Sequence, residues 1–135
     1  MMRRVLVVDD EPLLADTLCA ILVRHGFACS VAYGGEAALV QAGQFLPDTL
    51  LTDVMMPGMN GCELATGLTT LVPSLKVMFM SAYDRDFLVA RGLQPCGPVI
   101  TKPFTVEYLL RRVQMVLGDQ RAPVAASPRP SARAR

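Results

Sequence analysis

Short apolar runs alternate along the chain with segments in which apolar residues recur every three or four positions. The first run, residues 5–8, has no polar residue, which is typical of a strand that is buried on both faces of a parallel sheet. We expect five strands, over residues 5–8, 27–32, 47–52, 77–80 and 98–101. The segments between and after these strands predict amphipathic helices, at residues 12–25, 36–42, 62–71, 84–93 and 106–117.

Strand and helix alternate five times, with connections of only a few residues. Parallel strands need crossover helices, and the right-handed crossover rule restricts how such a chain can wind. The expected fold class is therefore α/β, a five-stranded doubly wound parallel sheet with helices on both faces. We expect one domain over residues 1–118. Residues 119–135 are rich in Ala, Pro, Ser and Arg without periodicity, which predicts a disordered basic tail.

The composition suits one domain with a single core, since 52% of the 135 residues are hydrophobic and 19% are charged. The charge is unevenly placed. Residues 1–118 hold nine Lys and Arg against eleven Asp and Glu, a net charge of −2, whereas residues 119–135 hold four Arg against one Asp, a net charge of +3. The mildly acidic body argues against a nucleic-acid-binding face on the folded part.

The four cysteines are far apart in the sequence, and the chain has a single histidine. This spacing supports neither a zinc site nor a disulfide framework, so we interpret the cysteines as apolar residues in a reducing compartment. No apolar run approaches the length of a membrane span, and the run after the first four residues is too short for a signal-peptide core. We therefore expect a cytoplasmic protein without a membrane partner.

Four of the five expected strands end in residues suited to phosphoryl chemistry: Asp9-Asp10, Asp53, Ser81 and Lys102. The carboxyl ends of parallel strands meet at one edge of the sheet, which is where ligands bind in open α/β folds. Carboxylates crowded into one crevice repel each other and favour either a shared proton or a hard cation. Mg²⁺ fits such a site because it prefers oxygen ligands and leaves room for a phosphate oxygen. A lysine and a hydroxyl can bind other oxygens of the same phosphate.

Other chemistries have weaker support. No thiol or hydroxyl with an adjacent base suggests acyl transfer, and the chain has no Gly-rich nucleotide-binding loop of either common type. A flavin-binding protein of similar topology stays a weak alternative, because no phosphate-cradling loop follows the first strand.

Four blocks of the sequence resemble the receiver domain of two-component response regulators. They are Val7-Val8-Asp9-Asp10-Glu11, the stretch from Asp53 to Gly61, Met80-Ser81-Ala82 and Thr101-Lys102-Pro103-Phe104. The resemblance covers residues 3–118 in order, and residues 57–81 are most similar to receivers associated with hybrid histidine kinases. It implies a flavodoxin-like sheet with the strand order 2-1-3-4-5.

The resemblance also implies a role for each residue at the strand ends. Asp53 would accept a phosphoryl group from the phosphohistidine of a histidine kinase or histidine phosphotransferase. Lys102 would pair with Asp53 and then with the phosphoryl group, while the Ser81 hydroxyl would bind the phosphate and report its arrival. The implied ligands of Mg²⁺ are Asp10, Asp53, the backbone carbonyl of Met55 and, through water, Asp9. The resemblance further implies a cis bond between Lys102 and Pro103.

Two features depart from the family pattern. Receivers usually carry an aromatic residue three positions before the lysine, and here that position is Val99. The segment between Ser81 and Lys102 is also slightly short. The chemistry should survive both changes, but the usual aromatic coupling cannot operate as it does in the family. In addition, Met55 and Tyr83 stand where they could shield an acyl phosphate from water, so we expect slow hydrolysis.

We therefore expect a phosphorylatable receiver that catalyses only its own phosphorylation and dephosphorylation and is otherwise not an enzyme. Because seventeen residues are too few for an output domain, we expect a stand-alone response regulator with no DNA-binding domain. It would bind a kinase or phosphotransferase and an unknown effector protein, as a monomer or weak dimer. The alternative is a phosphorylation-independent docking module with the same fold, which Val99 keeps open. The sequence does not name the kinase, the effector or the stimulus.

Overall fold

The computed structural model describes residues 2–118, which form a parallel sheet of five strands in the order β2-β1-β3-β4-β5. The strands are β1 (Arg4–Val8), β2 (Ala28–Ala32), β3 (Thr49–Asp53), β4 (Lys76–Ser81) and β5 (Val99–Thr101). The fold class and the strand order expected from the sequence are both confirmed. The disordered tail that we expect over residues 119–135 lies outside the described residues, so it stays a prediction.

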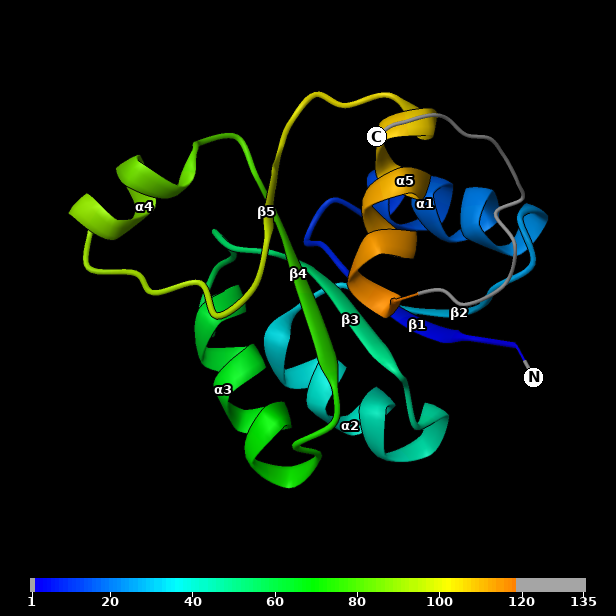
Figure 1. The fold of residues 1–135 in the computed structure, drawn as a ribbon. Coiled ribbons are helices and arrows are strands. Elements are labelled where there is room, and N and C mark those ends of the chain that lie inside the picture. Colours follow the sequence, from blue (N-terminus) through cyan, green and yellow to red (C-terminus); the bar gives the residue numbers. More distant parts are fainter. Residues whose placement is uncertain (1, 119–135) are drawn as a thin grey trace.

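Five helices connect the strands or follow the last one: α1 (Pro12–Arg24), α2 (Gly35–Phe45), α3 (Gly61–Leu71), α4 (Arg85–Ala90) and α5 (Val106–Leu117). α1 and α5 cover one face of the sheet, and α2 and α3 cover the other (Figure 1). α4 extends beyond β4 and β5 at one end of the molecule. No helix of residues 2–118 is long and apolar enough to cross a membrane.

Each face of the sheet has its own hydrophobic core, and the apolar run of β1 supplies both. Val5 and Val7 point into the core beneath α1 and α5, while Leu6 and Val8 point into the core beneath α2 and α3. All four side chains are fully buried. Burial on both faces explains why the run has no polar alternation, since side chains of a strand point to opposite faces in turn. The carboxyl end of β1 is thereby held rigidly from both sides.

Helix boundaries differ from the sequence expectation at two places. α2 passes through Gly43 and ends at Phe45, where Leu46 closes the helix in the left-handed conformation with φ 57°. α4 ends at Ala90 instead of Leu93, because Gly92 has φ 84° and turns the chain away. The Leu93 side chain then packs back against the core beneath α2 and α3. Its apolar character therefore reflects packing after the helix and not a longer helix.

Candidate functional site

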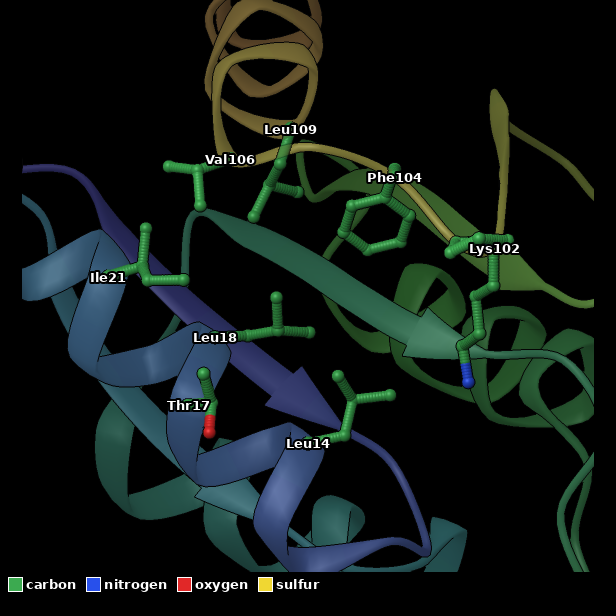
Figure 2. A pocket seen from close by; sticks show the side chains of 9 residues that line it. Leu14, Thr17, Leu18, Ile21, Lys102, Phe104, Val106 and Leu109 are labelled. Carbon is green, nitrogen blue, oxygen red and sulfur yellow. The ribbon is translucent and has the colours of Figure 1, made fainter.

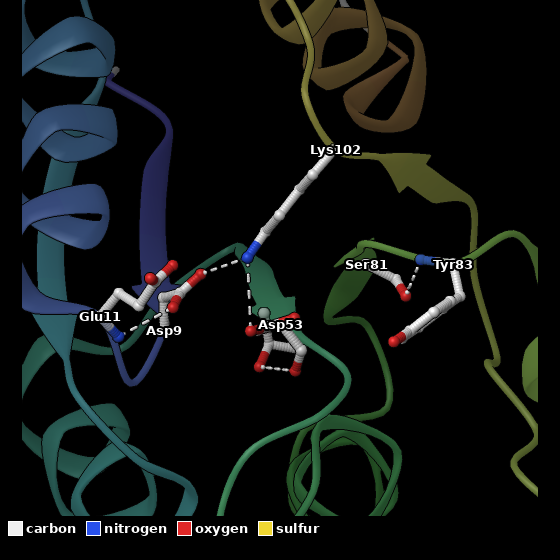
Figure 3. Close-up of polar contacts among 7 residues, drawn as sticks. Asp9, Glu11, Asp53, Ser81, Tyr83 and Lys102 are labelled. Atoms are coloured by element: carbon white, nitrogen blue, oxygen red, sulfur yellow. Dashed lines mark hydrogen bonds and ion pairs between the residues drawn. The ribbon is translucent and has the colours of Figure 1, made fainter.

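Asp9, Asp53 and Lys102 meet at the carboxyl edge of the sheet although they are far apart in the sequence (Figure 3). Lys102 Nζ lies 3.0 Å from Asp9 Oδ2 and 3.4 Å from Asp53 Oδ2. One ammonium group thus contacts carboxylates at the ends of two different strands. The structure brings together these three side chains, which the sequence analysis placed at the ends of three strands.

The sequence around Asp9 fixes its carboxylate in place. Asp9 follows β1 directly, is fully buried, and donates its backbone N–H to the Ala32 carbonyl at 3.2 Å. Its Oδ1 accepts a hydrogen bond from the backbone N–H of Glu11 at 2.9 Å, which closes a tight turn. The turn leads into α1, whose first residue is Pro12. Oδ2 is left directed toward Lys102.

Asp53 is the last residue of β3 and pairs with Met80 of β4. Its backbone is held on the other side by the start of α3, because Gly61 donates its N–H to the Val54 carbonyl at 2.8 Å. A Cβ at position 61 would overlap the Asp53 carbonyl oxygen. The sequence pattern that predicts a helix at residues 62–71 gives no sign of this contact. Gly61 positions the acceptor carboxylate by letting the helix approach the strand closely.

Lys102 is positioned by β4 as well as by its own strand. Its backbone N–H donates to the Ser81 carbonyl at 2.7 Å, which continues the pairing of β4 with β5 by one residue. The bond from Lys102 to Pro103 is cis. The side chain extends from this point across the edge of the sheet to the two aspartates (Figure 3).

Three carboxylates gather at this edge. One oxygen each from Asp9, Asp10 and Asp53 can be chosen so that all lie within 4.8 Å of one another. Asp9 and Asp53 are buried and Asp10 is exposed, so the cluster opens to solvent on one side. Carboxylate oxygens at this spacing, with an open side for water, are the donor set that Mg²⁺ prefers. The residues present therefore fit a hard divalent cation.

The local electrostatics follow from burial and crowding. Burial raises the pKa of the Asp53 carboxyl to about 6; the charges of Asp9 and Asp10 raise it as well, while Lys102 acts in the opposite direction. Burial alone would lower the pKa of Lys102, but its hydrogen bond to Asp9 and the charges of both buried aspartates raise the pKa above its ordinary value. Lys102 thus keeps its positive charge, whereas burial destabilises the ionised form of Asp53.

Ser81 and Met55 lie at the border of this cluster. Ser81 ends β4, is fully buried, and accepts a hydrogen bond at Oγ from the backbone N–H of Tyr83 at 2.9 Å. Both residues lie on the β4 side of the aspartates (Figure 3). Met55 follows β3 by two residues and its side chain is exposed, as is the ring of Tyr83. The roles given to these residues stay predictions, and the geometry supplies the surroundings in which to test them.

A second hollow lies behind Lys102 and differs in character (Figure 2). It has a volume of about 300 Å³ and is lined almost wholly by apolar side chains of α1, α5 and the segment that joins β5 to α5. Leu14, Leu18 and Phe104 face it, with Lys102 at one end. Such a lining offers almost nothing to a phosphate, so the polar chemistry belongs to the carboxylate cluster.

The comparisons with known proteins agree with this geometry. The response regulator receiver domain family matches residues 5–114. This chain belongs to that family. It is therefore a receiver domain of two-component signalling, as the four sequence blocks indicate.

The receiver is similar to the probable transcriptional regulatory protein TcrX of Mycobacterium tuberculosis, with 35% identity over 84% of this chain and 49% of TcrX. Among solved structures it is similar to TrrA of Thermotoga maritima in complex with Mg²⁺-BeF, with 29% identity, a TM-score of 0.72, and 85% of this chain and 99% of that chain covered. It also resembles the receiver domain of the hybrid histidine kinase CckA, with 28% identity, a TM-score of 0.71, and 84% and 98% of the two chains covered. The expected likeness to receivers of hybrid kinases is confirmed.

One expectation was wrong. We expected partners that included no DNA-binding domain and a downstream effector bound by a stand-alone receiver, but the curated relatives are transcriptional and DNA-binding regulators. The chain spans about half the length of these relatives. The expectation rested on the seventeen residues that follow Gly118, and the length of a segment after a domain does not determine what the domain acts upon.

Proposed function

We propose that this receiver accepts a phosphoryl group on Asp53 from the phosphohistidine of a histidine kinase, with the help of Mg²⁺. The observation that carries the proposal is the contact of one ammonium group, that of Lys102, with the carboxylates of both Asp9 and Asp53. A lysine between two buried acids is poised to bind an additional anionic group on Asp53. The Mg²⁺-BeF complex of the relative TrrA supports the same chemistry.

The residues of this chain would share the work as follows. An Asp53 carboxylate oxygen attacks phosphorus, a new O–P bond forms, the P–N bond to histidine breaks, and its electron pair leaves with the imidazole, which takes up a proton. Lys102 stabilises the negative charge on the phosphoryl oxygens, and the Ser81 hydroxyl donates a hydrogen bond to one of them. Rigid strands position all three groups, so catalysis is mostly positioning and electrostatics.

Mg²⁺ would be held by Asp10, Asp53 and the Met55 backbone carbonyl, with Asp9 contributing through water. When bound, it supplies a divalent positive charge that offsets the charge of the phosphoryl oxygens and of the crowded carboxylates. Because Asp9 is fully buried and already bonded to Lys102 and to Glu11, it is better suited to orient a water molecule than to move toward the ion.

The receiver would catalyse only its own phosphorylation and dephosphorylation and have no separate substrate. The four free cysteines suit a reducing compartment, so we place the protein in the cytoplasm. The first statement depends on the proposed role of Asp53, whereas the second depends on the cysteines.

The test is incubation of the protein with Mg²⁺ and a small phosphodonor such as acetyl phosphate, followed by mass spectrometry. We expect an adduct of one phosphoryl group that is stable in acid and labile in base. Asp53→Asn should abolish it. The matched control is Asp86→Asn, which removes an exposed carboxylate on α4 and should leave the adduct unchanged.

Two outcomes would count against the proposal. An adduct of equal yield in Asp53→Asn would move the acceptor elsewhere. No adduct in the wild type, together with no Mg²⁺ binding, would favour the alternative of a docking module that keeps the fold without the chemistry. Thermal unfolding of each variant ensures that a lost adduct does not reflect a lost fold.

A further inference from the structure

Two thiols from different elements meet between α1 and the sheet. Cys19 belongs to α1 and Cys29 to β2, and a side-chain hydrogen bond joins the two residues. Both are partly exposed, and neither takes part in the proposed chemistry of Asp53. This thiol pair is therefore a separate place at which the protein can be modified covalently.

The packing of α1 along β2 holds the pair from both ends. The helix and the strand lie side by side (Figure 1). Before the strand, the Phe27 N–H donates to the Leu22 carbonyl at 3.0 Å. After the strand, the Tyr33 hydroxyl donates to Asp16 Oδ1 at 2.7 Å. Asp16, Cys19 and Leu22 follow one another at intervals of three residues and share one face of α1, so the thiol of the helix lies between the two contacts.

The sheet fixes the other thiol. Cys29 pairs with Val5 of β1, and both side chains belong to the core beneath α1 and α5. β2 is nevertheless an edge strand, so one of its sides has no neighbouring strand. The two sulfur atoms are thus held next to each other by well-packed elements, at a place that a small reagent in solution can reach.

The surroundings of Cys29 suit it to an intramolecular reaction. Burial raises the pKa of the Cys29 thiol, and its hydrogen bond to Cys19 and the charge of that residue raise the pKa further. A thiol that keeps its proton is a poor nucleophile toward a reagent in solution. A group held beside its reaction partner, however, reacts as if its partner were highly concentrated. Cys19 is therefore suited to the first attack on a reagent, and Cys29 to the second step within the protein.

We propose that Cys19 and Cys29 form a reversible disulfide when the protein meets a small disulfide such as oxidised glutathione. The Cys19 thiolate attacks one sulfur of the oxidant, the S–S bond of the oxidant breaks, and its electron pair leaves with a glutathione thiolate. Cys29 then loses its proton and attacks Cys19 Sγ, which releases the second glutathione as a thiolate. Two protein thiols are oxidised, one glutathione disulfide is reduced, and the two protons go to the two glutathione thiolates.

The cross-link ties α1 to the edge strand of the sheet. It closes a loop that contains the end of α1 and the start of β2, which disfavours the unfolded chain. By thermodynamic linkage, the fold favours the disulfide by the same factor by which the disulfide favours the fold. For a loop of about ten residues this factor is on the order of 100. A disulfide that forms and is reduced again suits a redox-sensing role in a reducing compartment.

Equilibration with glutathione tests the proposal. The wild-type protein is incubated at defined ratios of oxidised to reduced glutathione, free thiols are trapped with a maleimide, and mass spectrometry counts them. Cleavage after Arg24 and Glu36 places Cys19, Cys29 and Cys62 on three different peptides, so the linked pair can be identified. We expect a disulfide between Cys19 and Cys29, with an equilibrium constant on the order of 100-fold higher than in the same chain unfolded by urea.

Single variants separate the two steps. In Cys29→Ser we expect the reaction to stop with glutathione bound to Cys19. In Cys19→Ser we expect Cys29 to stay unmodified as long as the protein is folded. The matched control is Cys96→Ser, which removes an exposed thiol outside the pair and should keep the disulfide. Urea denaturation of each reduced variant checks that its fold is intact.

Equal equilibrium constants in the folded and the unfolded chain would overturn the proposal, because the fold would then contribute nothing to the pairing. A wild-type product in which Cys19 keeps its glutathione beside a free Cys29 would also overturn it, since the two thiols would then be packed together without reacting. No phosphodonor is used in this test, so its result does not depend on whether Asp53 is the phosphoryl acceptor.

Discussion

The receiver has two halves at its carboxyl edge that differ in rigidity. β1 and β3 are paired on both sides within the sheet, and their side chains from Val5 to Val8 and from Thr49 to Asp53 are buried. At the other end, β5 is an edge strand of three residues, and the connecting helix α4 has six. The proposed phosphoryl acceptor thus lies on the rigid half, while the side chains suited to respond to it lie on the loosely held half. Chemistry that depends on fixed distances and a response that depends on movement can coexist because they occupy different strands.

The strongest test of the rigid half is Gly61→Ala. A methyl group at this position would overlap the Asp53 carbonyl oxygen and crowd Val54, so α3 or the end of β3 must move. We expect a loss of about 1–3 kcal/mol in the free energy of unfolding, as for other overpacked sites. We also expect slower phosphorylation, because the displaced backbone carries Asp53. Urea denaturation and the yield of the acetyl phosphate adduct measure the two effects.

The matched control is Gly67→Ala in the same helix. Its Cβ would meet only the Leu39 side chain, at an ordinary contact distance of 3.9 Å. Since alanine favours a helix over glycine, we expect a gain of about 0.5–1 kcal/mol. If both variants lost stability equally, helix propensity would be irrelevant and the close approach at Gly61 would not be the cause.

The second test uses the raised pKa of Asp53. Burial raises the pKa of this carboxyl from 3.8 to about 6, so the folded state binds its proton more tightly than the unfolded state. The group therefore contributes stability below about pH 4, and this contribution is lost as the pH rises through 6. Asp53→Asn removes the charge, and at pH 7 without Mg²⁺ we expect it to raise the free energy of unfolding by on the order of 1 kcal/mol.

The advantage of Asp53→Asn should shrink as the pH falls toward 4, because the wild-type carboxyl is then protonated in the folded state and about half protonated in the unfolded state. Denaturation at pH 4, 5, 6 and 7 measures this trend. Saturating Mg²⁺ should reduce the difference at pH 7, because an ion bound only to the folded state stabilises the wild type. A gain in stability that stayed constant across this pH range would show that the Asp53 carboxylate is not destabilised by burial.

The rigid half was also the more predictable half from the sequence. The apolar runs mark the buried strands, and the rules for parallel connections bring their carboxyl ends to one edge. Asp9 and Asp53 of this half, and Lys102 at the end of β5, could therefore be placed together from the sequence, and the structure does place them together. The sequence signal is strongest for β1, because burial on both faces of the sheet makes its run from Val5 to Val8 wholly apolar.

The flexible half could not be predicted as well. The apolar residues after α4 suggested a helix to Leu93, yet Leu93 packs against the core after the chain has turned at Gly92. The stacking of Tyr83 on Phe87 was also missed, because Tyr83 lies before α4 begins. The turn in which the Tyr83 N–H donates to Ser81 Oγ contributes to the position of its ring. Contacts that depend on a turn and on tertiary packing leave no period in the sequence.

A third test concerns how α4 is held. The Arg85 guanidinium donates to the Pro95 carbonyl at 3.0 Å and to the Gly97 carbonyl, which ties the start of α4 to the segment before β5. Arg85→Ala removes both hydrogen bonds. Because the residue is exposed, we expect a loss of global stability of no more than about 1 kcal/mol. We expect much faster amide hydrogen exchange in residues 85–98, since this region opens locally.

The comparison for Arg85→Ala is Arg111→Ala, which removes an exposed arginine from the outer surface of α5. Exchange in α4 should be unchanged in this variant. If Arg85→Ala instead accelerated exchange equally in β1 and β3, the two halves of the edge would be held as one unit and the distinction drawn between them would be wrong.

The smallest expected effect concerns the lifetime of the phosphorylated state. Each half of the carboxyl edge has one exposed side chain near Asp53 or Ser81. Met55 follows Asp53 and Tyr83 follows Ser81, and they are 46% and 45% exposed. We predict that both side chains limit the access of water to an acyl phosphate on Asp53. Met55→Gln keeps the length of the side chain but adds an amide that can bind water, so we expect the phosphorylated protein to lose its phosphoryl group several times faster, with stability nearly unchanged. Release of phosphate after removal of the donor measures this rate.

Met115→Gln on α5 is the matched control, because it makes the same change at an exposed site far from Asp53 in the sequence. An unchanged lifetime in Met55→Gln would mean that the Met55 side chain does not limit the access of water to the phosphoryl group.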